Sequence, residues 1–371
     1  MHTELCDLFG IEYPIFAFSH CRDVVAAVSK AGGLGVLGAV GFTPDQLDVE
    51  CNWIDEHVDG KPYGVDTVMP AKAADAKGTE PEEVAAYIQS MIPEEHKRFV
   101  DELMARFDLP PLPEGSDFRG VTGWAEGVAH RHVEVALGHP ICLLANALGS
   151  PPPDVIEQAH QQGIKIAALA GKAQHAQRHV NNGVDIIVAQ GYEAGGHTGE
   201  IATMVLVPEI VAAVAPVPVL AAGGIGTGRQ IAAAMALGAQ GVWMGSLWLT
   251  TAESSASSEV IERYLEATSS DTVRSRSYTG KPARMLRSAW TDAWEDPKGP
   301  GPLGMPLQNI LTAEANARIA RSHRKDLAFA PVGQIVGSMN SVRPVRDVMF
   351  DLVNDYIEAV EGLTAGLGGS S

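Results

Sequence analysis

The stretch VLAAGGIGTGRQIAAAMALGAQGVWMGS, residues 219–246, decides the fold. It contains a short apolar strand that ends in Gly223-Gly224, then an amphipathic helix, then a second apolar strand that ends in Gly245-Ser246. Strands that are apolar along their whole length are typical of parallel sheets covered by helices on both faces. The stretch therefore predicts a strand–helix–strand unit of an α/β protein.

The same alternation of strands and helices precedes this unit, and eight strands are expected in all. An open doubly wound sheet would be expected to show GxGxxG after its first strand, where this chain has FAFSHCRD (16–23). The pattern therefore favours an eight-stranded parallel TIM (β/α)8 barrel. The expected strands are 13–19, 35–40, 62–68, 141–147, 165–171, 185–191, 217–224 and 241–246.

Two segments depart from the barrel pattern. Residues 71–135 are charged, rich in proline and partly helical, which predicts an insertion after the third strand. Beyond residue 255 the pattern becomes helical and irregular. We expect residues 1–255 to form the barrel, with 71–135 inserted in it, and residues 256–371 to form a helical C-terminal region that packs on the barrel.

The composition excludes several classes of function. The formal net charge is −18, so a nucleic-acid partner or an anionic membrane is not expected, because both need a basic surface. No apolar run approaches the roughly 20 residues that span a bilayer, and the N-terminal segment lacks a secretory signal, so we expect a cytoplasmic protein. The four cysteines show no CxxC spacing, and we expect neither a metal site nor disulfides (Cys6, Cys21, Cys51 and Cys142).

The two glycine-rich strand ends predict a phosphate site. In a TIM barrel the loops after the seventh and eighth strands commonly bind phosphate. Thr227 and Gly228 begin a helix whose N-terminus favours negative charge. Backbone N–H groups of the glycine loops can approach an anion closely, and the residues concerned are Gly223, Gly224, Gly226, Gly245 and Ser246.

The stretch AQGYEAGGHTGE, residues 189–200, follows the sixth strand and lies at the same end of the barrel. Gly195 and Gly196 allow the loop to lie beside a planar ligand, and the Gln190 amide can hydrogen-bond a heteroaromatic edge. His197 projects from this glycine loop, and an ordinary imidazole pKa of about 6.5 suits proton transfer near neutral pH. We expect His197 to be catalytic.

These residues resemble a known family. AQGYEAGGHTG, followed by strands ending in AAGGI and MGS, is similar to the nitronate monooxygenases, formerly called 2-nitropropane dioxygenases. The resemblance covers roughly residues 8–70 and 140–255, and it implies an FMN-binding TIM barrel with His197 as the catalytic histidine. It implies cofactor contacts from Phe18, Asp66, Gln190, Gly195, Gly196, Gly223, Gly224, Gly245 and Ser246.

The resemblance also implies a reaction. FMN would oxidise an alkyl nitronate, dioxygen would reoxidise the flavin, and a carbonyl compound and nitrite would form. The expected partners are a small-molecule substrate and O2. A homo-oligomer is left open.

Two strand ends depart from the family pattern. The first strand ends in AFSH, where the family has Ala-Pro-Met, so Ser19 and His20 replace a methionine near the flavin. The third ends in GVD, so that Asp66 replaces a neutral amide. A carboxylate would repel an anionic nitronate unless it is protonated or paired. We expect His20 to be its partner.

Other functions remain open from the residues alone. The same cofactor would serve an NAD(P)H-dependent reductase or an enoyl-thioester reductase or dehydrogenase. A sugar-phosphate isomerase or aldolase barrel would need no flavin, and a barrel of the inosine-monophosphate dehydrogenase type would need a cysteine where His197 stands.

Two C-terminal stretches could contribute to a site. SYTGKPARMLR (277–287), expected to be a loop, carries Lys281, Arg284 and Arg287, which would form either an anion-binding cluster or a solvated turn. In the strand-like stretch PVGQIVGSMNSVRP (331–344), the resemblance brings Gln334 near the flavin.

Overall fold

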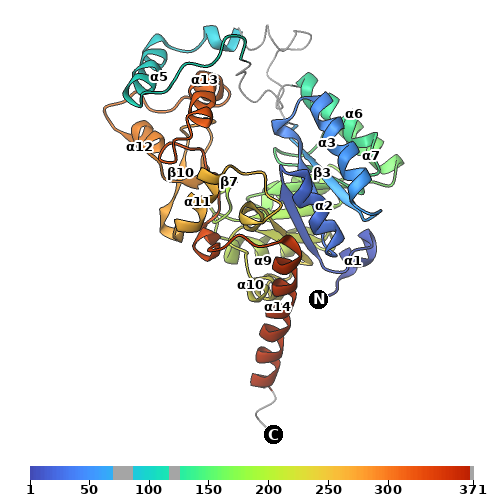
Figure 1. The fold of residues 1–371 in the computed structure, drawn as a ribbon. Coiled ribbons are helices and arrows are strands. Elements are labelled where there is room, and N and C mark those ends of the chain that lie inside the picture. Colours follow the sequence, from blue (N-terminus) through green and yellow to red (C-terminus); the bar gives the residue numbers. More distant parts are fainter. Residues whose placement is uncertain (70–86, 117–125, 368–371) are drawn as a thin grey trace.

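The computed structural model describes residues 1–69, 87–116 and 126–367. Eight parallel strands close into a barrel in which each strand pairs with the next and the last pairs with the first (Figure 1). The expected TIM barrel is confirmed. Its strands are β1 (Ile15–Ser19), β2 (Leu34–Gly38), β3 (Tyr63–Thr67), β4 (Leu143–Asn146), β5 (Lys165–Ala170), β6 (Ile186–Gln190), β8 (Val219–Ala222) and β9 (Gly241–Met244).

Helices cover the outside of the barrel, because each crossover between parallel strands returns over the sheet. Helix α1 (Glu4–Phe9) instead closes the end at which the strands begin, where Leu5 and Phe9 pack on Phe16 inside the barrel. The outer helices are α2 (Arg22–Lys30), α3 (Pro44–His57), α6 (Glu126–Leu137), α7 (Pro153–Gln161), α8 (Ala173–Asn181), α9 (Thr203–Val214) and α10 (Gly228–Ala236).

Side chains along each strand alternate between two cores. Val36 and Val188 belong to the core inside the barrel, whereas Val65 and Ile187 belong to the core between the barrel and its helices. Successive side chains of a strand point to opposite faces. Asp66, which follows Val65, therefore points into the barrel near the end of its strand.

Helices α5 (Glu94–Arg106) and α6, between β3 and β4, pack in different places. Most of helix α6 lies within the expected 71–135 insertion, but the helix packs against α3 and β3, in the position of a barrel helix. Helix α5 lies beside α13 (Leu307–Arg321), away from the barrel (Figure 1). Leu103 of α5 shares a hydrophobic core with Trp290 and Trp294. Residues 70–86 and 117–125 of the expected insertion lie outside the described residues.

The C-terminal region is mostly helical, as predicted, and also holds a small antiparallel sheet. Its helices are α11 (Ser258–Glu266), α12 (Ala289–Glu295), α13 and α14 (Val345–Leu367), and the second half of α14 extends away from the body (Figure 1). The sheet has the order β10 (Thr272–Ser275), β11 (Ala283–Leu286) and β7 (Gly196–His197).

One local prediction in this region was wrong. Residues 277–287 are not only a loop, because residues 283–286 form β11 between two partner strands. The strand-like start of 331–344 forms an antiparallel bridge from Pro331 to Met285, and a short 3-10 helix, Gln334–Ser338, follows. No helix of the described ranges is both long and apolar enough to cross a membrane.

A candidate active site at the mouth of the barrel

The ends of four strands place predicted site residues around the mouth of the barrel. Phe18 (β1), Asp66 (β3), Gln190 (β6) and Gly245 (after β9) lie at the carboxyl ends of their strands. Phe18 packs against the inner core, and its ring stacks on Trp243 with centroids 6.3 Å apart. A Cβ on Gly245 would lie 3.7 Å from the Phe18 ring. The structure therefore brings the expected site residues together at this mouth.

The loop after β8 follows a backbone path that needs glycine. Gly223 and Gly224 have φ angles of +95° and +71°. A Cβ on Gly223 would lie 3.1 Å from the Ala194 nitrogen. A side chain at either position would be strained, and at Gly223 it would also crowd the loop that leads to His197.

Four backbone donors at this mouth are unpaired. Within the part of the chain that the structure describes, the N–H groups of Gly223, Gly224, Gly245 and Ser246 donate no hydrogen bond. Backbone N–H groups of folded proteins are almost always paired with protein or water. A set of free donors on neighbouring glycine-rich loops is the arrangement that binds an anion such as a phosphate.

The nearby helix N-terminus, by contrast, already holds an anion of the protein itself. The Gly226 N–H donates to Gln230 Oε1 at 2.8 Å, and the Arg229 N–H at the start of α10 donates to the Asp355 carboxylate of α14 at 2.9 Å. The Arg229 side chain pairs with the same carboxylate. The expectation that Gly226 and the start of this helix receive a phosphate was therefore wrong, because Gln230 and Asp355 use these donors.

The loop after β6 is held by the C-terminal region as well as by its own side chains. A Cβ on Gly195 would lie 2.7 Å from the Gly333 nitrogen, so the two backbones are in close contact. The Gly333 N–H donates to Ser246 Oγ at 2.8 Å, and the Gln334 N–H donates to the Glu193 carbonyl at 2.9 Å. The segment that contains Gln334 thus links the loop after β6 to the loop after β9.

Glu193 fixes the same loop from inside. Its carboxylate accepts the Thr203 N–H at 3.0 Å and the Thr203 hydroxyl at 2.8 Å. The carboxylate thereby caps the start of α9, so Glu193 supports the loop that carries His197.

His197 lies on the two-residue strand β7 and pairs with Ala283 of β11. Its Nε2 lies 2.8 Å from the Thr279 hydroxyl, and the side chain is exposed. Desolvation by the surrounding protein and, to a smaller extent, the nearby Lys281 cation together lower the pKa of His197 to about 4. The imidazole is therefore neutral at pH 7 and can accept a proton or a hydrogen bond.

Asp66 is a buried carboxyl group without an ion pair. Its side chain is 4% exposed, and its Oδ1 atom has no hydrogen-bond partner in the described residues. Burial raises the pKa of Asp66 to about 8, and the backbone of Ala147 opposes this only in part. The carboxyl group is thus mostly protonated at pH 7.

His20 is not the partner of Asp66, so that expectation was wrong. Its Nδ1 instead lies 2.9 Å from the Gly38 carbonyl, and its ring packs edge-on against Phe18 with centroids 5.1 Å apart. Burial by the surrounding protein lowers the pKa of His20. A neutral His20 beside an uncharged Asp66 gives this side of the mouth little charge at pH 7.

The three basic residues of 277–287 do not form one cluster. Arg284 is buried and donates to the Tyr192 carbonyl at 3.0 Å, with its guanidinium 4.4 Å from the centre of the Tyr192 ring. Arg287 pairs with Asp292 at 2.7 Å. Only Lys281 is exposed near His197. Of the two alternatives left open for this stretch, a shared anion-binding cluster is not formed, because Arg284 is buried in β11 and Arg287 pairs with Asp292.

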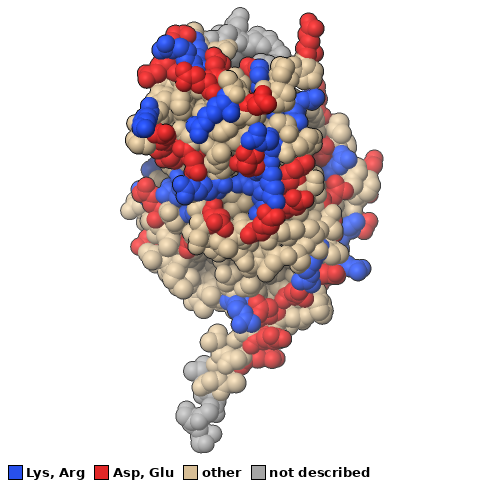
Figure 2. All heavy atoms as spheres, turned by 60° about the vertical axis from the view of Figure 1, so that its left-hand side comes forward, with Lys and Arg blue, Asp and Glu red and all other residues tan. Residues whose placement is uncertain are grey.

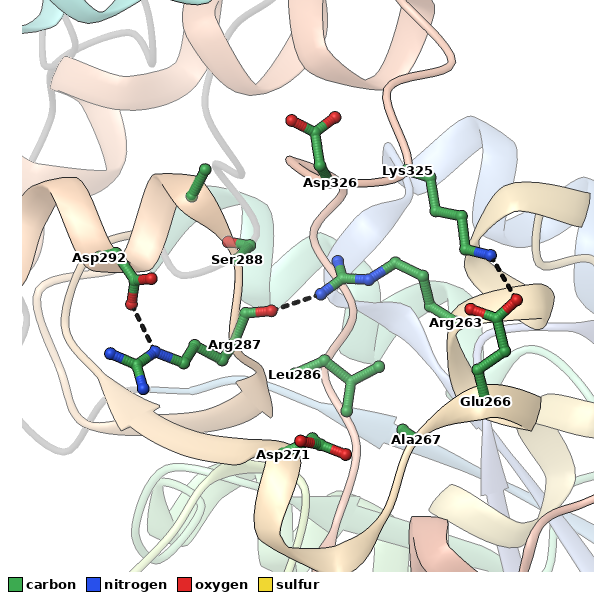
Figure 3. Close-up of a pocket in the computed structure, with 11 residues that line it drawn as sticks. Arg263, Glu266, Ala267, Asp271, Leu286, Arg287, Ser288, Asp292, Lys325 and Asp326 are labelled. Carbon is green, nitrogen blue, oxygen red and sulfur yellow. Dashed lines mark hydrogen bonds and ion pairs between the residues drawn. The ribbon is translucent and has the colours of Figure 1, made fainter.

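Arg287 lines a separate hollow of about 720 Å3 on the C-terminal region (Figure 3). Two of its cations are paired with carboxylates, Arg287 with Asp292 and Lys325 with Glu266 at 2.7 Å, whereas Arg263 donates to the carbonyls of Ala328 and Arg287 (Figure 3). Basic and acidic side chains are also mixed across the surrounding face (Figure 2). The three basic side chains that line this hollow therefore already have partners among the described residues.

Sequence reasoning missed Thr279, which contacts His197 directly. The signal that could have found it is the turn YTGKP (278–282) between two segments of strand character, which is typical of a hairpin. No comparable signal marks Asp355, whose carboxylate reaches α10 from 126 residues away.

Comparisons with known proteins show the family of this chain. A sequence profile of the family described as "Nitronate monooxygenase" matches residues 2–355. A Mycobacterium tuberculosis protein that carries a provisional monooxygenase name, Rv1533, is 54% identical over 97% of this chain and 98% of its own. A Staphylococcus aureus protein named "Probable nitronate monooxygenase" is 29% identical, with 97% of this chain and 98% of its own covered.

Two solved structures share the fold along their whole length. Nitroalkane oxidase from Streptomyces ansochromogenes has a TM-score of 0.80 and 26% identity, with 97% of this chain and 99% of that chain covered. FabK from Thermotoga maritima has a TM-score of 0.73 and 26% identity, with 98% and 99% covered. Because the family profile matches almost the whole chain, this protein belongs to the nitronate monooxygenase family and is an oxidoreductase.

Proposed function

We propose that this protein uses FMN and O2 to oxidise an alkyl nitronate to a carbonyl compound and nitrite. The observation that carries the proposal is the pairing of two features at one barrel mouth. Unpaired N–H donors line two glycine-rich loops, and a neutral histidine lies on the neighbouring loop. The family match and the nitroalkane oxidase neighbour support the same reaction class.

The residues present fit FMN. Gly223, Gly224, Gly245 and Ser246 would hold its phosphate with their free backbone N–H groups. The other residues expected at the cofactor lie around the same mouth and would contact the ring system: Phe18, Asp66, Gln190, Gly195 and Gly196. When bound, FMN supplies the two-electron oxidation of the substrate and passes the electrons to dioxygen.

Two side chains would determine how the substrate is received. Neutral His197 would accept a proton from the carbon beside the nitro group, or would hydrogen-bond the nitronate. Asp66 would remain uncharged at pH 7, so it would not repel an anionic substrate. An uncharged carboxyl group also has an O–H to donate, as the neutral amide of the family pattern has an N–H.

The test is turnover with a defined substrate. Purified protein should release FMN on denaturation, and with an alkyl nitronate and O2 it should form nitrite and the carbonyl compound in equal amounts. With the corresponding nitroalkane, whose carbon must first lose a proton, His197→Asn should keep the cofactor and lose about a hundredfold or more in kcat, the usual scale of general acid–base catalysis. Nitrite formation at the wild-type rate by His197→Asn would remove His197 from the mechanism.

A second candidate is reduction of the flavin by NAD(P)H for an acceptor such as an enoyl thioester. The exposed cation of Lys281 near His197 favours it. The two functions differ in the electron donor: a reductase would consume NADH or NADPH with its acceptor and would form no nitrite from a nitronate.

A further inference from the structure

The hydroxyl of Thr279 contacts one nitrogen of His197 and leaves the other available. The Thr279 oxygen lies 2.8 Å from Nε2, and the described residues give Nδ1 no hydrogen-bond partner. The same hydroxyl lies 3.3 Å from the Lys281 carbonyl, which can only accept. If the single hydroxyl hydrogen goes to that carbonyl, the oxygen accepts from Nε2–H.

The loop that carries Thr279 is held firmly in place. Thr279 lies in the turn between β10 and β11, and β11 pairs directly with the strand of His197. The next residue, Gly280, has a φ of +81°, and a Cβ there would lie 2.4 Å from the Met305 nitrogen. The turn therefore fits closely against a neighbouring loop, and a bulkier residue at 280 would displace it.

Helix α13 anchors the same turn with two fully buried polar side chains. Gln308 Nε2 donates to the Ser277 carbonyl at 2.8 Å, and the Thr312 hydroxyl lies 2.9 Å from the Gln308 carbonyl and 3.2 Å from the Tyr278 carbonyl. Both side chains are 0% exposed. Buried side-chain hydrogen bonds to consecutive carbonyls fix the position of a turn, so Thr279 is presented to His197 from a rigid support.

We propose that Thr279 is the positioning residue of His197: its oxygen accepts the Nε2–H of the imidazole and leaves Nδ1 as the nitrogen that meets the substrate. The inference rests on the proposed role of His197 toward the substrate. In a neutral imidazole only one nitrogen carries a proton, so fixing Nε2–H makes Nδ1 the acceptor. A proton leaving the carbon beside a nitro group would then move to Nδ1, and its electron pair would stay on the substrate as the nitronate.

Nitrogen NMR of the FMN-loaded protein, with 15N-labelled histidine, tests the assignment without substrate. The His197 signals are assigned by their loss in His197→Gln. In the wild type we expect a protonated Nε2 and an unprotonated Nδ1. Thr279→Val, which keeps the shape and removes the hydroxyl, should give a mixture of both tautomers, and Thr279→Ser should restore the wild-type signals.

Thr364→Val is the matched control, because Thr364 is exposed on α14 and its hydroxyl bonds only the Val360 carbonyl. It should leave the His197 signals unchanged. Should Thr279→Val fail to fold, Thr279→Ala is measured with the same expectation. A wild-type proton on Nδ1, or unchanged His197 signals in both hydroxyl-free variants, would overturn the proposal.

Kinetics with an alkyl nitro substrate add a second readout. Thr279→Val should lower kcat by about ten- to a hundredfold with KM within about threefold, because misorientation of a catalytic group affects the chemical step. A protein that oxidises no nitronate but shows the expected NMR signals would refute the proposed function and keep this inference. Turnover of the alkyl nitro substrate by Thr279→Val at the wild-type rate would keep the proposed function and refute this inference.

Discussion

Asp66 shows how one residue can change what a site accepts. Its carboxyl group lies inside the barrel near the end of β3, where the described residues give its Oδ1 atom no hydrogen-bond partner. A buried acid without a partner avoids the cost of charge by keeping its proton. The chain therefore places an acid where the family pattern has an amide, and the burial keeps that acid neutral near pH 7.

The buried acid predicts a stability that depends on pH. The folded-state pKa of about 8 lies above the ordinary value of 3.8, so the folded protein holds a proton that the unfolded chain releases between those values. Stability should fall as pH rises through that window. Asp66→Asn should not lose stability in this way. Its free energy of unfolding, relative to that of the wild type, should therefore rise with pH by at most about 1.4 kcal/mol per pH unit.

Denaturant unfolding from pH 5 to pH 8 checks this, with the exposed Asp59→Asn as the control. The gain of Asp66→Asn should increase across the range and that of Asp59→Asn should not. A gain that stays constant with pH would show that Asp66 is charged in the folded protein.

Lys281 predicts a shift in the titration of His197. Desolvation by the protein around the partly accessible ring is the main reason for the low pKa of His197, and the Lys281 cation adds to it. Lys281→Gln should therefore raise the pKa of His197 from about 4 toward, but not up to, its ordinary value of 6.5. The acid limb of kcat/KM, which falls as His197 becomes protonated, should move to higher pH.

The matched control is Lys30→Gln, at the end of α2 and thus at the opposite end of the barrel. It should leave the acid limb in place. An acid limb that moves to lower pH in Lys281→Gln would contradict the electrostatic account.

At this scale the sequence predicted the residues that belong to motifs and missed those that act across the fold. His197, Gly223 and Gly224 follow strands in a recognisable order, so their shared position could be inferred. Thr279 depends on how a distant hairpin returns to β7, and the neighbours of Asp66 depend on which face of the barrel each strand presents. Neither follows from local spacing, which is why His20 was assigned to the wrong partner.

Among the elements, the contact between α10 and α14 fills the helix N-terminus at which the sequence led us to expect a phosphate. Asp355 of α14 occupies the start of α10, and α14 lies so close that a Cβ on Gly228 would be 2.1 Å from the Leu352 carbonyl oxygen. A helix N-terminus attracts a negative charge, but the charge can come from the chain itself. The glycine at position 228 serves this helix contact and not a phosphate.

The close contact predicts opposite effects for two glycine-to-alanine changes. Gly228→Ala should lower the free energy of unfolding by about 1–3 kcal/mol, because the added methyl group forces α14 away. Gly362→Ala, on an exposed part of α14 with nothing within 4 Å, should raise it by up to about 1 kcal/mol. Denaturant unfolding of both variants measures this, and a neutral or stabilising Gly228→Ala would contradict the packing.

The strands and most helices could be predicted because each carries its own periodicity. Strand β11 could not, since its pairing with β7 depends on a two-residue partner that has no pattern of its own. Helix α6 carries a helical pattern, but its place in the barrel depends on packing against α3. Local patterns thus indicate what an element is, and tertiary contacts decide where it lies.

For the whole molecule, the barrel supplies the cradle and the C-terminal region supplies the support for the histidine. The hairpin β10–β11 extends the strand of His197, and helix α13 anchors its turn. Helix α5, from the interval between β3 and β4, packs with α13 and α12 in one hydrophobic core. The domain boundaries at residues 71, 135 and 255 remain predictions, while this packing joins segments that are far apart in sequence.

Anaerobic mixing of the flavin-loaded protein tests most directly whether a nitronate reduces the flavin. The reaction is followed by the visible absorption of the flavin, and an alkyl nitronate should bleach it within the time of one turnover. NADH and NADPH should do so far more slowly. With the corresponding nitroalkane, whose carbon must first lose a proton, His197→Asn should slow the bleaching by about a hundredfold. Rapid bleaching by NADH or NADPH, with a flavin that stays oxidised in the presence of the nitronate, would contradict the account and assign the protein to the reductases.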